Sequence, residues 1–384
     1  MDYLSILTKL VSLDTSVPPG KNYKEAVTYL EPFFKNCGFQ TQQVEIPPEH
    51  AENRPERVNL ICRRANPGHP RLIFYAHIDV VPAQGWPAFE PHIEDNKLFG
   101  RGAADMKGAI PALLMALEKG RDQVLNYDIT VMITTDEEYS QASQLRYISR
   151  FLEPLKGAYF FDLDSNFGYV SVANLGALQM DILVKGRSVN SALSHLGENA
   201  VEKAVPLMEA LLKLKTRVAA RKSHIAAHPE SGLDKMTARL NINMVQGGLK
   251  VNIVPDQCTI SIDRRLIPEE NLEDARKEIL ETLAGVQNVE WEITREFDIP
   301  TLPPCEDPIT DKLAAVLKEV TGEGGKYGEM GSGDLANIVV NEWGGQEFGM
   351  GVIRTESNIH GHNEFVRLKD IEDLAEVIYR FVTV

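Results

Sequence analysis

The sequence lacks several features that mark particular protein classes. It has only four cysteines, and no two of them form a Cys-x-x-Cys pair. Widely spaced thiols indicate a reducing compartment rather than a disulfide scaffold. No apolar run approaches the ~20 residues of a membrane span, and the N-terminal residues do not resemble a secretory signal. These absences predict a cytoplasmic protein.

Positive charge is also scarce, because 40 Lys and Arg residues face 55 Asp and Glu residues, for a formal net charge of -15. An acidic surface repels nucleic acid and anionic membranes, so we expect neither as a partner. Aromatic residues make up only 7% of the chain, whereas the 43% hydrophobic and 25% charged fractions are typical of a soluble globular protein. A chain of 384 residues suits two domains better than one core.

The order of predicted elements separates the chain into two parts. Up to about residue 176, short apolar strands alternate with helices, which predicts an α/β domain with a mostly parallel central sheet. Residues 177–293 instead carry strands of alternating polarity and two amphipathic helices, which is typical of a small α+β domain. The alternation of helices and strands then returns. We therefore expect residues 1–176 and 294–384 to form one domain, with 177–293 inserted into it.

Histidine and carboxylate residues follow directly after predicted buried strands. His77 and Asp79 come after the apolar run at 71–76. Residues i and i+2 share a face of a strand, so the two side chains can point together. This suits a metal-bound histidine whose second nitrogen is held by an acid, with a satisfied core histidine as the alternative. Asp105 lies between glycines in Gly100–Gly108, where it could be a ligand or could cap the helix that follows.

Three consecutive acids, Asp136, Glu137 and Glu138, follow the predicted strand at 127–134. Burying adjacent carboxylates costs several kcal/mol unless they are paired or bind metal. A solvated loop is the alternative. If the acids are buried, two neighbouring carboxylates allow one to bind metal and the other to accept a proton.

The same pattern recurs twice more in the sequence. Asp162 and Asp164 follow the strand at 157–161, and a polar cluster reads His360-Gly-His-Asn-Glu364. Ligand sites in open α/β sheets form at the carboxyl ends of strands, so we expect these clusters to meet there. Imidazole and carboxylate ligands without thiolates suit zinc, cobalt or manganese, and one bridging carboxylate would give a two-metal centre.

Taken in order, these motifs resemble the M20 metallopeptidase family. The resemblance is to the group of acetylornithine deacetylases, succinyl-diaminopimelate desuccinylases and related carboxypeptidases. The matching motifs are Ala76–Val81, Gly100–Gly108, Asp136–Glu138 and His360–Glu364. The resemblance implies a zinc-hydrolase catalytic domain interrupted by a smaller lid domain, and a homodimer formed through that lid.

The resemblance also implies roles for individual residues around two divalent ions, zinc first and cobalt or manganese as alternatives. Glu137 would be the general base, and Asp79 would be the partner behind His77. The first ion would be held by His77, Asp105 and Asp162, and the second by Asp105, Glu138 and His360.

Three residues of the predicted lid are candidates for contact with substrate. Asn252 matches a turn of the family, and Arg265 could bind a substrate carboxylate in two-point fashion. An ion pair with Asp263 is the alternative for Arg265. Asn190 stands where the family usually has a histidine that stabilises the oxyanion. An asparagine amide can still donate to an oxyanion, but losing one such donor can cost ~10²–10³ in turnover.

Three functions follow from the resemblance. The first is an N-acyl amino acid deacylase, and the second is a dipeptidase or carboxypeptidase that acts on short peptides with the same site. Asp at position 162, where the deacylases usually have Glu, favours the second. The third is a non-catalytic metal-binding or ligand-binding relative, suggested by Asn190. Glu137 argues against the third, because a binding module has no use for a proton acceptor.

Overall fold

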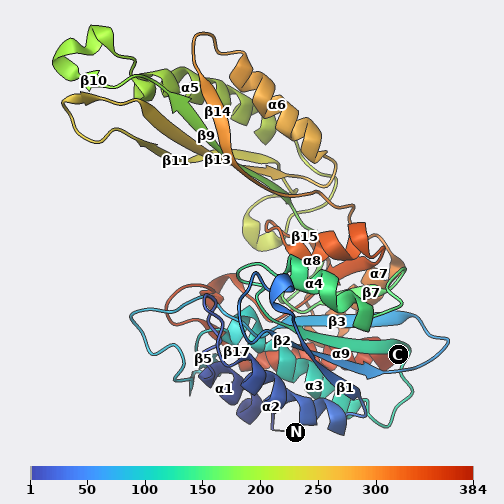
Figure 1. Ribbon diagram of the computed structural model, residues 1–384. Helices are drawn as coiled ribbons and strands as arrows, with labels where there is room; N and C mark the ends of the chain where they lie inside the picture. The colour runs from blue at the N-terminus through green and yellow to red at the C-terminus, as the bar shows by residue number, and fades with distance from the viewer. Residues whose placement is uncertain (1, 384) are drawn as a thin grey trace. The chain divides into compact units, whose positions relative to one another are not determined.

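The computed structural model describes residues 2–383 and divides into two compact units (Figure 1). Unit 1 comprises the chain up to Val172, Cys305–Tyr327 and the chain from Asp334. Unit 2 comprises Ala173–Pro304 and Gly328–Gly333. The predicted inserted range, 177–293, lies within unit 2.

Unit 1 is an α/β structure built on an eight-stranded sheet with strand order β1-β2-β6-β3-β7-β16-β8-β15. Its central strands β6, β3, β7 and β16 run parallel, and the outer pairs β1–β2, β2–β6 and β16–β8 are antiparallel. The predicted α/β fold with a mostly parallel central sheet is therefore confirmed. The strands are β1 (Gln40–Glu45), β2 (Val58–Arg64), β3 (Arg71–His77), β6 (Asp128–Thr134), β7 (Tyr159–Asp162), β8 (Val170–Ala173), β15 (Lys326–Gly328) and β16 (Gln346–Gly349).

Helices cover both faces of this sheet, because its central strands are apolar on both sides. On one face the Phe161 ring packs against the rings of Phe74, Phe348 and Phe381. On the other face Tyr75 and other sheet residues share a buried cluster with residues of α4 and α8. The helices are α1 (Tyr3–Ser12), α2 (Tyr23–Asn36), α3 (Ala109–Lys119), α4 (Ala142–Ile148), α7 (Pro308–Thr321), α8 (Asp334–Asn337) and α9 (Leu368–Thr383). A small sheet joins β4 (His92–Glu94), β5 (Lys97–Phe99) and β17 (Phe365–Arg367).

Unit 2 is a four-stranded antiparallel sheet with two helices packed over it (Figure 1). Alternate residues of β9, from Leu178 to Val184, are buried against α5 residues such as Leu207 and Leu211. The elements are β9 (Gly176–Lys185), β11 (Arg239–Gly247), β13 (Gln257–Leu266), β14 (Trp291–Ile299), α5 (Ala200–Ala219) and α6 (Leu272–Ala284). A separate two-stranded ribbon pairs β10 (Val189–Asn190) with β12 (Ile253–Val254).

The boundary after unit 2 differs from the sequence expectation. The expected end at residue 293 falls inside β14, which pairs with β9 along Trp291–Ile299. β14 reads Trp-Glu-Ile-Thr-Arg-Glu-Phe-Asp-Ile, in which apolar residues alternate with polar ones except at Arg295. The sequence therefore carried a strand pattern that the expected boundary cut short. Within the described residues, no helix is long and apolar enough to cross a membrane.

Candidate metal centre

The carboxyl ends of three neighbouring parallel strands meet at one edge of the sheet in unit 1. In the register of β3 with β6, His77 lies opposite Thr134, and in that of β3 with β7, Tyr75 lies opposite Asp162. The polar residues that follow β3, β6 and β7 therefore emerge side by side. The sheet register explains why clusters far apart in sequence can form one site.

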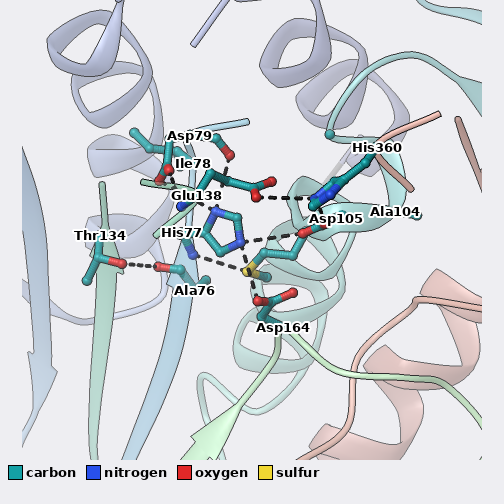
Figure 2. A network of polar contacts seen from close by, with 12 residues as sticks. Ala76, His77, Ile78, Asp79, Ala104, Asp105, Thr134, Glu138, Asp164 and His360 are labelled. Atoms are coloured by element: carbon teal, nitrogen blue, oxygen red, sulfur yellow. Dashed lines mark hydrogen bonds and ion pairs between the residues drawn. The ribbon is translucent and has the colours of Figure 1, made fainter. Parts of the chain in front are cut away.

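Five side chains at this edge form two groups that could each hold a metal ion (Figure 2). His77 Nε2 lies 3.5 Å from Asp105 Oδ1 and 3.5 Å from Asp164 Oδ2. His360 Nε2 lies 3.0 Å from Asp105 Oδ2 and 3.2 Å from Glu138 Oε2. Asp105 thus contributes one carboxylate oxygen to each group, which is the arrangement of a bridging ligand.

Asp164, rather than the expected Asp162, completes the group around His77. β7 ends at Asp162, and the chain then turns so that the backbone N–H of Asp164 donates to Asp162 Oδ1 at 2.9 Å. The Asp162 carboxylate is therefore bonded to its own turn, while Asp164 faces His77 (Figure 2). This geometry favours Asp164 over Asp162 as the third ligand of that ion.

Asp79 lies behind His77, on the side away from the candidate ligands. His77 Nδ1 is 3.1 Å from the backbone oxygen of Asp79 and 3.5 Å from its carboxylate Oδ1. The other carboxylate oxygen accepts a hydrogen bond from the backbone N–H of Glu138 at 3.0 Å. Asp79 therefore orients the imidazole and also fixes the turn that carries a ligand of the second group.

The charge balance of the centre favours bound cations. Hydrogen bonds with Asp105 and Glu138 raise the pKa of His360 to about 10. Burial opposes charge on His77, but its contacts with Asp105 and Asp164 hold its pKa well above the ordinary value. The buried Nε2 of His77 has no hydrogen-bond partner among the residues that the structure describes. Divalent ions would satisfy this nitrogen and the carboxylates around it, so the residues present fit a two-metal centre.

Glu137 lies next to the candidate ligand Glu138 and is partly buried. Burial raises its pKa well above the ordinary range, and the charge of Asp164 acts in the same direction, whereas His77 opposes it. A carboxyl group whose environment disfavours its charged form holds a proton readily. That property suits a residue that accepts a proton and then gives it up.

The third acid of the triplet, Asp136, is a buried structural residue. Its carboxylate accepts hydrogen bonds from Tyr23 Oη at 2.9 Å, Arg57 Nε at 2.8 Å and Gln144 Nε2 at 2.6 Å. These bonds fix Asp136 in a left-handed conformation with φ of 66°. They anchor the turn that presents Glu137, a role that the run of three equal acids in the sequence did not reveal.

Lys107 anchors the loop that carries Asp105 to the end of α1. Its buried Nζ donates to the backbone oxygens of Leu10 at 3.0 Å and Leu13 at 3.1 Å, at the end of α1. Burial lowers the pKa of Lys107 to about 7. A neutral amine still has two N–H bonds for these two acceptors, so the anchor persists in either protonation state.

The three predicted substrate residues belong to unit 2. Asn190 and Asn252 are brought together in the β10–β12 ribbon, where the backbone N–H of Ser191 donates to the backbone oxygen of Asn252 at 3.0 Å. The Asn190 side chain is exposed and accepts from the backbone N–H of Ala192 at 3.0 Å. Arg265 donates to Asp263 at 3.0 Å and to Ser332 Oγ at 3.0 Å, while its side chain stays 28% exposed.

Comparison with known proteins adds to this geometry. The sequence model of the family described as peptidase family M20/M25/M40 matches residues 73–384. The chain is 29% identical over 353 residues to a succinyl-diaminopimelate desuccinylase of Marinobacter nauticus, covering 84% of this chain and 85% of that protein. Its fold is similar to that of an M20 metallo-carboxypeptidase of Sulfolobus solfataricus, with a TM-score of 0.78, 17% identity and coverage of 99% and 98%. The aminopeptidase PepT of Bacillus cereus gives a TM-score of 0.78 at 18% identity, with coverage of 99% and 97%.

Proposed function

The chain belongs to peptidase family M20/M25/M40, and from this premise we propose that it hydrolyses the amide bond of an N-acyl amino acid. Membership confirms the resemblance drawn from the sequence motifs and makes the protein a metallo-hydrolase that acts on C–N bonds. The finer assignment is a deacylase of the acetylornithine deacetylase and succinyl-diaminopimelate desuccinylase type. It is supported by the 29% identity to a desuccinylase.

The observation that carries this proposal is the pair of ligand groups that share Asp105. Two divalent ions held there would lower the pKa of a water molecule and polarise the carbonyl of the scissile amide. We assign the first ion to His77, Asp105 and Asp164, and the second to Asp105, Glu138 and His360. Zinc is the first choice because the donors are imidazoles and carboxylates, with cobalt or manganese as alternatives.

The surrounding residues supply the acid–base chemistry of the reaction. Glu137 would accept the proton of the attacking water and pass it to the leaving amine. Asp79 would keep the His77 imidazole oriented through the hydrogen bond between its backbone oxygen and Nδ1, which leaves Nε2 directed at the ligand group. His77 and Asp79 are completely buried, which would keep competing water away from them.

We propose roles for the residues of unit 2 on the substrate side. The Arg265 guanidinium is oriented by Asp263 and Ser332 and would bind the carboxylate of the amino acid. Asn190 would donate its amide N–H to the oxyanion, and Asn252, next to it in the β10–β12 ribbon, would contact the substrate. The net charge of -15 supports a small-molecule partner over nucleic acid or a membrane, and the cytoplasmic location stays a prediction.

A substrate screen tests the proposed function. The full chain, loaded with zinc, cobalt or manganese, would be given N-acetyl and N-succinyl amino acids and a set of dipeptides. We expect the highest kcat/KM on an N-acyl amino acid and two ions per chain by metal analysis. A folded protein that binds no metal, or that binds two ions and hydrolyses none of these compounds, would contradict the proposal.

A peptidase of short peptides is the second candidate. The third ligand of the His77 group is an aspartate, whether it is Asp164 or Asp162. Aspartate at this ligand position resembles the dipeptidases of the family more than its deacylases. In the screen, a higher kcat/KM on dipeptides than on N-acyl amino acids would select this candidate.

We also propose that the chain forms a homodimer through unit 2. β11 is an edge strand of the four-stranded sheet, and its Met244 and Val245 are 50% and 47% exposed. α5 adds exposed Val205 and Leu212 at 45% and 51%. Exposed sheet edges and exposed apolar side chains are features of surfaces that associate with another chain.

Light scattering after size-exclusion chromatography would test the dimer. We expect Val245→Lys to convert dimers into monomers, because a charge would then be buried at the interface. Val124→Lys is the matched control, since Val124 is an exposed valine of unit 1, and this variant should stay dimeric. A monomeric unmodified protein, or a dimeric Val245→Lys variant, would contradict this interface.

A further inference from the structure

The buried carboxylate of Glu364 gathers four hydrogen bonds from the loop that carries Asp105. Oε2 accepts from the Arg101 guanidinium at 2.7 Å and from the backbone N–H of Gly102 at 3.0 Å. Oε1 accepts from the backbone N–H groups of Ala104 at 3.0 Å and Asp105 at 3.1 Å. Glu364 itself is completely buried. One side chain therefore accepts from three backbone N–H groups of the loop, the last of which belongs to the shared ligand Asp105.

Glu364 also belongs to the segment that carries His360. That segment is bonded to the Asp105 loop at further points, because Arg101 donates to the backbone oxygen of Gly361 at 3.1 Å and the N–H of Gly100 donates to the backbone oxygen of Glu364 at 2.9 Å. The two segments also meet through their candidate ligands, since His360 Nε2 lies 3.0 Å from Asp105 Oδ2. The segment with Asp105 and the segment with His360 are thus joined both by the Arg101 and Glu364 bonds and by the ligands themselves.

We propose that Glu364 is a positioning residue that couples the two ion sites, so that its loss weakens both ions together. This inference rests on the proposed function. Asp105 is common to both ligand groups, and Glu364 fixes the backbone from which Asp105 projects. A change in that backbone displaces one oxygen from each site, whereas a change at His360 or His77 affects one site directly.

The charge of Glu364 is essential to this role, because all four of its partners are donors. Glutamine has the same shape, but its NH₂ group would face either Ala104 and Asp105 or Arg101 and Gly102, where only N–H groups are present. Two buried donors would lose their acceptor in either orientation. Glu364→Gln therefore disturbs the loop without creating a cavity.

Asp370 provides a matched control for the loss of a buried carboxylate. It is also buried and accepts two hydrogen bonds from Arg354, at 2.6 and 3.0 Å. Neither Arg354 nor Asp370 belongs to a ligand group. Asp370→Asn should cost stability through the same kind of lost ion pair and leave the ions in place.

The test measures ion binding in the full chain. The dissociation constants of both ions would be determined by competition with a chelator, and the visible absorption of the cobalt-loaded protein would report the ligand geometry. For Glu364→Gln we expect both constants to rise ~10- to 100-fold, the range found for residues that hold metal ligands in place. We also expect a changed cobalt spectrum. Asp370→Asn should keep both constants and the spectrum of the unmodified protein.

The outcomes separate this inference from the proposed function. If the unmodified protein binds no ions, the proposed function fails. If it binds two ions and Glu364→Gln keeps both constants, or weakens one ion alone, the coupling role of Glu364 is refuted. Should Glu364→Gln fail to fold by circular dichroism, Glu364→Asp takes its place. Its charge is retained but its reach is shorter, so unchanged constants in that variant would equally refute the role.

Discussion

Glu137→Gln is expected to lower kcat by ~10²–10⁴-fold, the usual contribution of a general base, while both ions stay bound. Glutamine keeps the size of the side chain but cannot accept a proton. Glu137 is in neither ligand group, so its replacement leaves the donors in place. Steady-state kinetics on the best substrate of the screen, with metal analysis of the same sample, would measure both effects.

Glu138→Gln is the control for this prediction, because Glu138 contributes an oxygen 3.2 Å from His360 Nε2. It should lose affinity for an ion as well as activity. If Glu137→Gln kept the kcat of the unmodified protein, another group would have to be the base. If it lost its ions, Glu137 would be a ligand and the division between Glu137 and Glu138 would be reversed.

Asp164→Asn is expected to weaken the ion at His77 by more than ~100-fold, beyond the effect of changing a residue that only supports a ligand. Asp162→Asn is expected to change the same constant by less than ~10-fold, the lower bound of that supporting effect. The asparagine oxygen at 162 can still accept from the N–H of Asp164, so the turn is preserved. Chelator competition on both variants would compare the two positions directly.

These two variants decide the assignment of the third ligand. Because they differ by two positions and remove one charge each, a general effect of net charge on the centre would weaken both equally. Stronger weakening in Asp162→Asn than in Asp164→Asn would restore the assignment made from the motif alone.

Much of the site was predictable because strand ends are visible in sequence. The runs before His77, Asp136 and Asp162 are apolar and short, and strands of a parallel sheet end at the same edge. We could therefore infer that the polar residues after these strands lie at the same edge of the sheet without knowing the strand order. The order β6-β3-β7, which brings the three ends together, came only from the structure.

The remaining errors arise where a local turn of the backbone, or a partner from a distant segment, decides what a side chain contacts. The choice between Asp162 and Asp164 depends on how the chain turns after β7, and both residues fit the same motif. The roles of Asp136 and Glu364 depend on donors from distant segments, Arg57 in one case and Arg101 in the other. Sequence spacing does not reveal such long-range partners.

The order of the ligands along the chain has a consequence for biosynthesis. Four of the proposed ligands precede Ala173–Pro304 of unit 2, whereas the fifth, His360, and its support Glu364 follow it. Because domains fold as they emerge from the ribosome, N-terminal part first, unit 2 can form while the last ligand and its support are still unsynthesised. During that interval the nascent chain carries an acidic cluster without His360 and a loop without its buried acceptor. We therefore expect capture of the second ion to be a late event in the maturation of the protein.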